Sequence, residues 1–101
     1  MKKIIDGKIY NTETAERICG YQYGTPGDFT YCSEDLYKTR KGAYFVAGEG
    51  GALTRYSRST GDNSTTGGEG LRVLPEDEAR KWCEQYGTAD DYVRTFGAEE
   101  A

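Results

Sequence analysis

Histidine is absent from the 101-residue sequence, and tryptophan and methionine occur once each. Without histidine the chain cannot form a Ser-His-Asp triad or an HExxH zinc site, and it lacks the usual general base for neutral pH. Long apolar runs are absent too. None approaches the ~20 residues of a membrane span, and Met1–Ile5 is too short for the apolar part of a signal peptide. The sequence therefore predicts a non-enzymatic protein of the cytoplasm with no membrane partner.

Basic residues are in short supply, with 13 Lys and Arg against 17 Asp and Glu and a net charge of -4. Proteins that bind nucleic acid normally carry a basic excess, so direct binding of duplex DNA is not expected. The acidic excess lies in residues 75–101, where eight Asp/Glu face three Lys/Arg, a net of -5. Two interpretations stay open: solvated helix faces, or a surface for a basic partner. The binding residues of that surface would be Asp77, Glu78, Glu84, Asp90 and Asp91.

Cysteine is scarce and odd in number, with Cys19, Cys32 and Cys83. An odd count without a signal peptide fits a reducing compartment. No Cys-x-x-Cys pair is present, and Cys19 and Cys83 both lie on predicted apolar helix faces, which favours packing in the core. The alternative is a structural zinc held by the three thiolates and a carboxylate such as Asp28. Apart from that alternative, no cofactor is expected.

Aromatic residues are abundant, at 13% of the chain, whereas disordered chains are poor in them. Six of the nine tyrosines lie between residues 21 and 56, close to several basic residues. Most of these tyrosines are explained by core packing. The alternative is a binding face for single-stranded nucleic acid, formed by Tyr37, Lys38, Arg40, Lys41 and Tyr56.

The N-terminal residues predict a hairpin followed by a helix. Asp6-Gly7 separates two β-prone runs, Lys2–Ile5 and Lys8–Tyr10, and both turn residues tolerate the positive φ of a type I′ turn. Thr12 is a candidate N-cap for the helix. Residues at helical spacing follow it: Ala15, Ile18, Cys19 and Gln22. We expect this helix to end near residues 20–23.

Turn residues separate short β-prone runs in the centre of the chain. Phe29–Tyr31 and Ala52–Ser57 are predicted strands, and Leu36–Thr39 and Ala43–Ala47 a predicted hairpin. Ser59–Gly70 contains no large apolar residue, so it cannot bury enough surface to offset the entropy of ordering. We expect a mobile loop at about residues 59–70 that folding does not require.

The C-terminal third predicts a last strand, Leu71–Leu74, and two helices. Pro75 suits a helix start and Gly87 a helix end, and Thr88 with Asp91 matches a capping box for the second helix. The predicted fold is a single α+β domain, a small and mostly antiparallel sheet with one N-terminal helix and two C-terminal helices. The predicted core comprises Ile18, Tyr44, Phe45, Trp82, Tyr86, Tyr92 and Phe96.

Three stretches resemble a group of small orphan proteins from phages and other mobile elements. Lys8–Ala15 resembles their opening, Leu36–Phe45 with the following Gly48–Gly51 is similar to their central hairpin, and Leu74–Trp82 to their closing helix. The resemblance implies a mobile-element accessory protein acting in a bacterial host. Such small acidic proteins include anti-CRISPR inhibitors, which act by binding a CRISPR effector.

The composition and the resemblance together lead to one expected function. The protein is expected to be a non-enzymatic inhibitor of the anti-CRISPR type, which binds a basic, nucleic-acid-handling effector such as a Cas nuclease through its acidic surface. Two alternatives remain: a small nucleic-acid-binding module that uses the Tyr/Lys/Arg face, and a metal-stabilised accessory domain of a mobile element.

Overall fold

The structure, a computed structural model, describes all residues from 1 to 101 and is α+β, with eight strands and two helices. The strands are β1 (Lys2–Ile5), β2 (Lys8–Asn11), β3 (Glu16–Tyr23), β4 (Cys32–Lys38), β5 (Tyr44–Gly50), β6 (Arg58–Gly61), β7 (Ser64–Thr66) and β8 (Gly68–Leu74). The helices are α1 (Glu76–Tyr86) and α2 (Ala89–Phe96). Every strand pair is antiparallel, which confirms the predicted, mostly antiparallel sheet.

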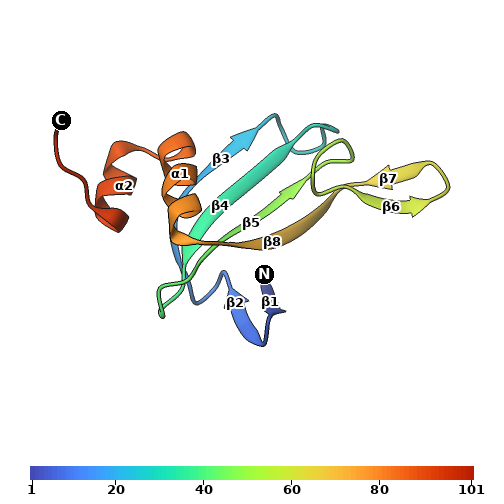
Figure 1. The fold of residues 1–101 in the computed structure, drawn as a ribbon. Helices are drawn as coiled ribbons and strands as arrows, with labels where there is room; N and C mark the ends of the chain where they lie inside the picture. The colour runs from blue at the N-terminus through green and yellow to red at the C-terminus, as the bar shows by residue number, and fades with distance from the viewer.

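A twisted four-stranded sheet in the order β3-β4-β5-β8 forms the centre of the molecule. The two helices cover one end of one sheet face, and hairpin β1-β2 lies below the opposite face (Figure 1). Hairpin β6-β7 projects from the far end of the sheet, and the molecule measures 51 × 33 × 20 Å along its principal axes. Neither helix has the length and apolar composition that would let it cross a membrane.

Both predicted hairpins are present. β1 and β2 pair around Asp6 and Gly7, whose φ angles of 51° and 76° are those of a turn with two left-handed residues. β4 and β5 pair from Lys38 opposite Tyr44 to Cys32 opposite Gly50, so this hairpin is longer than predicted.

The predicted N-terminal helix is wrong, because residues 16–23 form strand β3. Thr12 caps no helix, since its hydroxyl accepts a hydrogen bond from the Met1 amino group. A β-bulge between Arg17 and Cys19 explains the error. The bulge inserts one residue, so Ile18 and Cys19 are both buried on the same side of the strand. The apolar residues therefore lose the alternation that identifies a strand.

Three further segments differ from the prediction. Phe29–Tyr31 and Ala52–Ser57 form turns rather than strands. Ser59–Gly70 is not a loop without regular structure. It contains most of hairpin β6-β7 and the first residues of β8, where Gly68 pairs with Gly50 and Gly70 with Gly48. All residues of β6 and β7 are exposed, which agrees with the absence of apolar side chains there.

The two C-terminal helices are confirmed. α1 follows Pro75, carries acidic residues in its first turn and ends at Gly87. α2 has the complete capping box: the Thr88 hydroxyl accepts from the Asp91 amide, and the Asp91 carboxylate accepts from the Thr88 amide.

The core has two parts, one on each face of the sheet. Under the helices, Ile18, Leu36 and Val46 pack against Trp82 and Cys83. On the opposite face, a smaller cluster is built around Phe45, Ala47 and Tyr10, where hairpin β1-β2 covers the sheet. Of the predicted core residues, Ile18, Tyr44, Phe45 and Trp82 are buried, and Tyr86, Tyr92 and Phe96 are half-buried against the first cluster.

Candidate functional site

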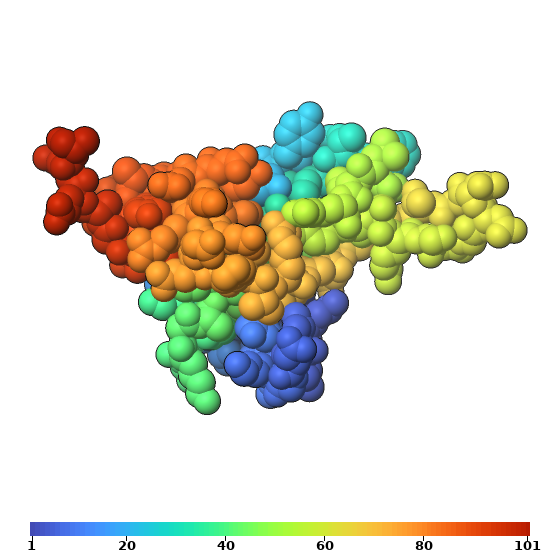
Figure 2. Space-filling view, in the orientation of Figure 1, coloured from blue at the N-terminus to red at the C-terminus, as the bar shows by residue number.

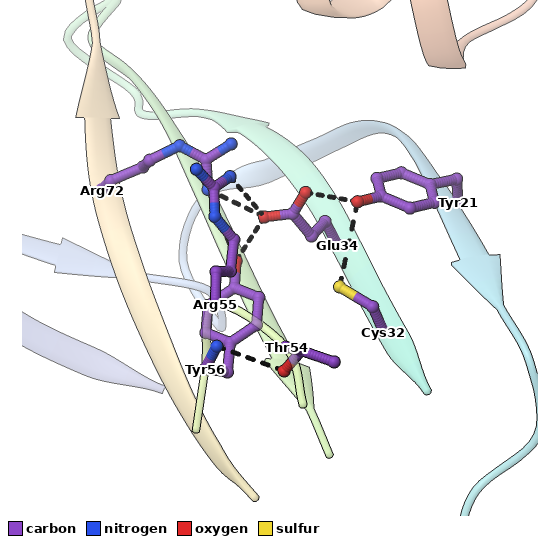
Figure 3. A network of polar contacts seen from close by, with 7 residues as sticks. All are labelled: Tyr21, Cys32, Glu34, Thr54, Arg55, Tyr56 and Arg72. Atoms are coloured by element: carbon purple, nitrogen blue, oxygen red, sulfur yellow. Dashed lines mark hydrogen bonds and ion pairs between the residues drawn. The ribbon is translucent and has the colours of Figure 1, made fainter. Parts of the chain in front are cut away.

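A buried carboxylate, Glu34 of β4, is the most unusual polar feature of the sheet. Its side chain is only 2% exposed. The Tyr21 hydroxyl donates to one carboxylate oxygen at 2.6 Å, and the Arg72 Nη1 donates to the other at 2.7 Å. The Tyr56 hydroxyl also donates to Glu34, and the Arg55 guanidinium lies 3.5 Å away (Figure 3). We call these five residues the Glu34 network.

Strand register places the Glu34 network. Tyr21, Glu34, Gly48 and Gly70 form one cross-strand row through β3, β4, β5 and β8. The two glycines lack side chains, so the ring of Tyr56 lies in the space above them and reaches Glu34. The segment 51–57 is thereby held against the same sheet face that carries the helices farther along.

The electrostatics of the network keep Glu34, Tyr21 and Tyr56 each in one protonation state near neutral pH. Burial by itself raises the pKa of Glu34, but the hydrogen bonds from Tyr21, Tyr56 and Arg72 outweigh it and hold this pKa below its ordinary value. Burial and the hydrogen bond to Glu34 raise the pKa of both tyrosines. Glu34 therefore stays ionised and the tyrosines stay protonated, which suits an anchor for segment 51–57 better than proton transfer.

The five residues of the predicted Tyr/Lys/Arg face do not form one surface in the structure. Tyr56 is buried in the Glu34 network, so its assignment to an exposed face is wrong. Tyr37 is half-buried on the other side of the sheet, stacked on Phe45 with ring centroids 5.1 Å apart. Lys38, Arg40 and Lys41 remain together at the β4-β5 turn, where Arg40 and Lys41 are exposed.

The five predicted acidic residues lie on the two helices, and all but one of them are exposed. Asp77, Glu78, Glu84 and Asp90 are exposed, and no ion pair within the chain uses them. We call these four residues the acidic helix surface. Asp91 is different, because its carboxylate is half-buried, caps α2 and pairs with Arg94 at 3.0 Å.

The three cysteines do not converge. The sulfur atoms of Cys19 and Cys83 lie 3.7 Å apart in the core, while the Cys32 sulfur contacts the Tyr21 hydroxyl at 3.8 Å. Burial, followed by the hydrogen bond with Cys83, raises the pKa of Cys19 to about 12. No cluster of three or more cysteine and acidic side chains has a geometry suited to a metal ion. The arrangement is that of a packed thiol pair and a separate third cysteine.

Sequence reasoning missed Glu34, although one signal was present. Residues two apart in a strand lie on the same face, so Glu34 shares the buried face of Leu36. Its arginine partner could not be found in this way, because Arg72 follows 38 residues later. No family model, curated protein or solved structure matches the chain.

Proposed function

We propose that this protein is a non-enzymatic inhibitor of the anti-CRISPR type, which binds a basic, nucleic-acid-handling effector nuclease through the acidic helix surface. One observation carries the proposal. Asp77, Glu78, Glu84 and Asp90 are exposed on the helical layer and are not neutralised by ion pairs within the chain. Two basic residues, Arg80 and Lys81, lie between Asp77 and Glu84, and Arg80 pairs with Glu76, so this part of the surface keeps an acidic excess. Free carboxylates of this kind complement a positively charged surface on a partner protein.

The helical layer also offers an apolar contact beside its charges. Val93 is 53% exposed and lies one helical turn after Asp90 on α2. Protein interfaces commonly combine an apolar centre with a polar rim. An effector that binds here would cover Val93 while basic side chains pair with the surrounding carboxylates. The folded chain would then act as a rigid acidic body and would need no catalytic group.

The test is capture of a guide-free CRISPR effector nuclease by the purified protein. Asp77→Lys with Glu84→Lys should weaken binding by several kcal/mol through repulsion, and wild-type affinity should fall steeply with salt. The matched control is Glu13→Lys with Asp62→Lys, an equal change of charge at exposed acids outside the helices. That control, and Lys38→Glu with Lys41→Glu, should retain binding. Equal losses in the acidic variants, or a loss confined to Lys38 and Lys41, would contradict the proposal.

A further inference from the structure

Two concave regions meet at the β4-β5 turn. The first, of about 620 Å³, lies between hairpin β1-β2 and the turn. The second, of about 520 Å³, lies between the turn and α2. Thr14, Thr39 and Arg40 line both, so the two regions adjoin each other, and we describe them together as one cleft. Figure 2 shows the hollow between the N-terminal hairpin, in blue, and the projecting green tip of the turn.

This cleft gathers positive charge in a molecule whose net charge is negative. Its basic residues come from four separate elements: Lys8 of β2, Lys38 of β4, Arg40 and Lys41 of the turn, and Arg94 of α2. Glu16 is the one acidic residue that lines it. Four of the five basic residues have no ion pair within the chain, and the fifth, Arg94, pairs with Asp91. We call these five side chains and their walls the basic cleft.

On the α2 side of the basic cleft, hydrogen bonds within the chain hold the Arg94 side chain in place. The Arg94 Nη2 donates to the Ile18 carbonyl at 3.2 Å and to the Asp91 carboxylate at 3.0 Å, which fixes the guanidinium at the cavity wall. Beside it, the Thr95 hydroxyl oxygen is buried and has no hydrogen-bond partner within the chain. Cationic side chains held in place in this way recognise phosphate oxygens.

The aromatic residues of this region argue for phosphate rather than base recognition. Tyr10 lines the cleft but is only 7% exposed, and Tyr44 lies buried beneath the Lys38 ammonium, 5.8 Å from its ring centroid. Neither ring offers an open face on which a base could stack. A flexible strand can follow a cleft whose walls come from hairpin β1-β2, the β4-β5 turn and α2, whereas a duplex is a stiff rod. We infer that the basic cleft binds the phosphate backbone of single-stranded nucleic acid, irrespective of base sequence.

The test is fluorescence anisotropy with a labelled oligouridine of about 12 nucleotides, within the range that single-strand-binding sites cover. The wild-type protein should bind it with a slope of log affinity against log salt of about −3, as expected for four phosphate contacts at about −0.7 each. Arg40→Glu with Lys41→Glu should lower the affinity at least tenfold at low salt and flatten this slope by about 1.4. The matched control, Arg58→Glu with Lys81→Glu, changes the charge equally outside the cleft and should bind like wild type.

Three results would overturn the inference: no binding of oligouridine by the wild type at low salt, equal losses in the two variants, or equal affinity for a duplex of the same length. The inference does not rest on the proposed function. A variant that loses the oligonucleotide but still captures the guide-free effector separates the basic cleft from the acidic helix surface. Failure of the wild-type protein to capture any effector, with its oligonucleotide binding intact, would remove the proposed function alone.

Discussion

The Tyr56 hydroxyl lies directly above Gly48, so close that a Cβ on this glycine would come within 2.5 Å of it. The same Cβ would meet the Ser33 carbonyl oxygen at 2.6 Å. Gly48→Ala should therefore destabilise the fold by about 1–3 kcal/mol, the usual cost of overpacking. Gly70→Ala should cost less, because its Cβ would lie 3.3 Å from the Tyr56 ring, where a small shift relieves the contact. Urea unfolding of both variants checks the order, and a neutral Gly48→Ala would show that Tyr56 does not pack here.

Removing the charge of Glu34 should be costly. Glu34→Gln keeps the size of the side chain but leaves Arg72 without its carboxylate partner. We expect a loss of about 3 kcal/mol, the lower end for breaking a buried ion pair, because Arg72 is 35% exposed and partly solvated. Arg17→Gln is the control, since it breaks the exposed pair with Asp35 and should cost about 1 kcal/mol or less. Equal losses in the two variants would contradict the anchoring role of Glu34.

The same carboxylate predicts how stability depends on pH. The pKa of Glu34 in the folded protein lies below its ordinary value of 4.5. The stabilisation is therefore complete above that value and is lost as pH falls through the lower, folded pKa. As pH falls below about 4.5 the wild type should lose more stability than Glu34→Gln, because the variant has no such carboxylate to protonate. Parallel pH profiles of the two proteins would show that Glu34 does not contribute to acid unfolding.

Turn and cap chemistry could be predicted from the sequence, whereas the first long strand could not. Asp6-Gly7 and the Thr88–Asp91 box act through neighbouring backbone groups, so a short window contains the whole signal. The prediction for β3 was wrong because the β-bulge makes Ile18 and Cys19 consecutive buried residues. Two adjacent apolar residues fit the period of a helix better than the alternation of a strand. Tertiary pairing with β4 decides the outcome there, and no local pattern carries that information.

Of the two candidate surfaces, one could be predicted from the sequence and the other could not. Exposure of Asp77 and Glu84 follows from helix periodicity and could be predicted. The basic cleft could not, because Lys8 and Arg94 meet the β4-β5 turn only through the packing of hairpin β1-β2 and α2 around it. Tyr56 was misplaced for a similar reason, since its burial depends on two glycines in strands that lie before and after it in the chain.

The cysteines should differ in reactivity. Cys19 and Cys83 are buried, and burial raises the pKa of both thiols, whereas Cys32 is partly exposed. Thiolate is the reactive form of cysteine. Iodoacetamide near neutral pH should therefore modify Cys32 in the folded protein, and all three cysteines only after unfolding. Mass spectrometry of the native and urea-treated protein measures this, and rapid native labelling of Cys19 or Cys83 would show that the core under α1 is open.

Hairpin β6-β7 should be dispensable for folding, whereas the first residues of β8 should not. Replacing Ser59–Thr66 with a short Gly-Ser link removes exposed residues, so stability should change by about 1 kcal/mol, as loop closure depends weakly on length. Extending the deletion to Gly70 also removes the pairs that Gly68 and Gly70 make with β5 and should cost clearly more. Thermal unfolding compares the two deletions. An equal effect of both would mean that the start of β8 does not contribute to the sheet.

The measurement that tests the proposed function most directly is inhibition of target-DNA cleavage by guide-loaded CRISPR effector nucleases in a purified system. The wild-type protein should abolish cleavage by its effector at near-equimolar concentration. Asp77→Lys with Glu84→Lys should restore cleavage, while Glu13→Lys with Asp62→Lys, with the same change of net charge, should still inhibit. Full cleavage by every effector of a panel spanning the CRISPR types, or equal inhibition by the two charge-reversed variants, would contradict the assignment of the acidic helix surface as an inhibitor interface.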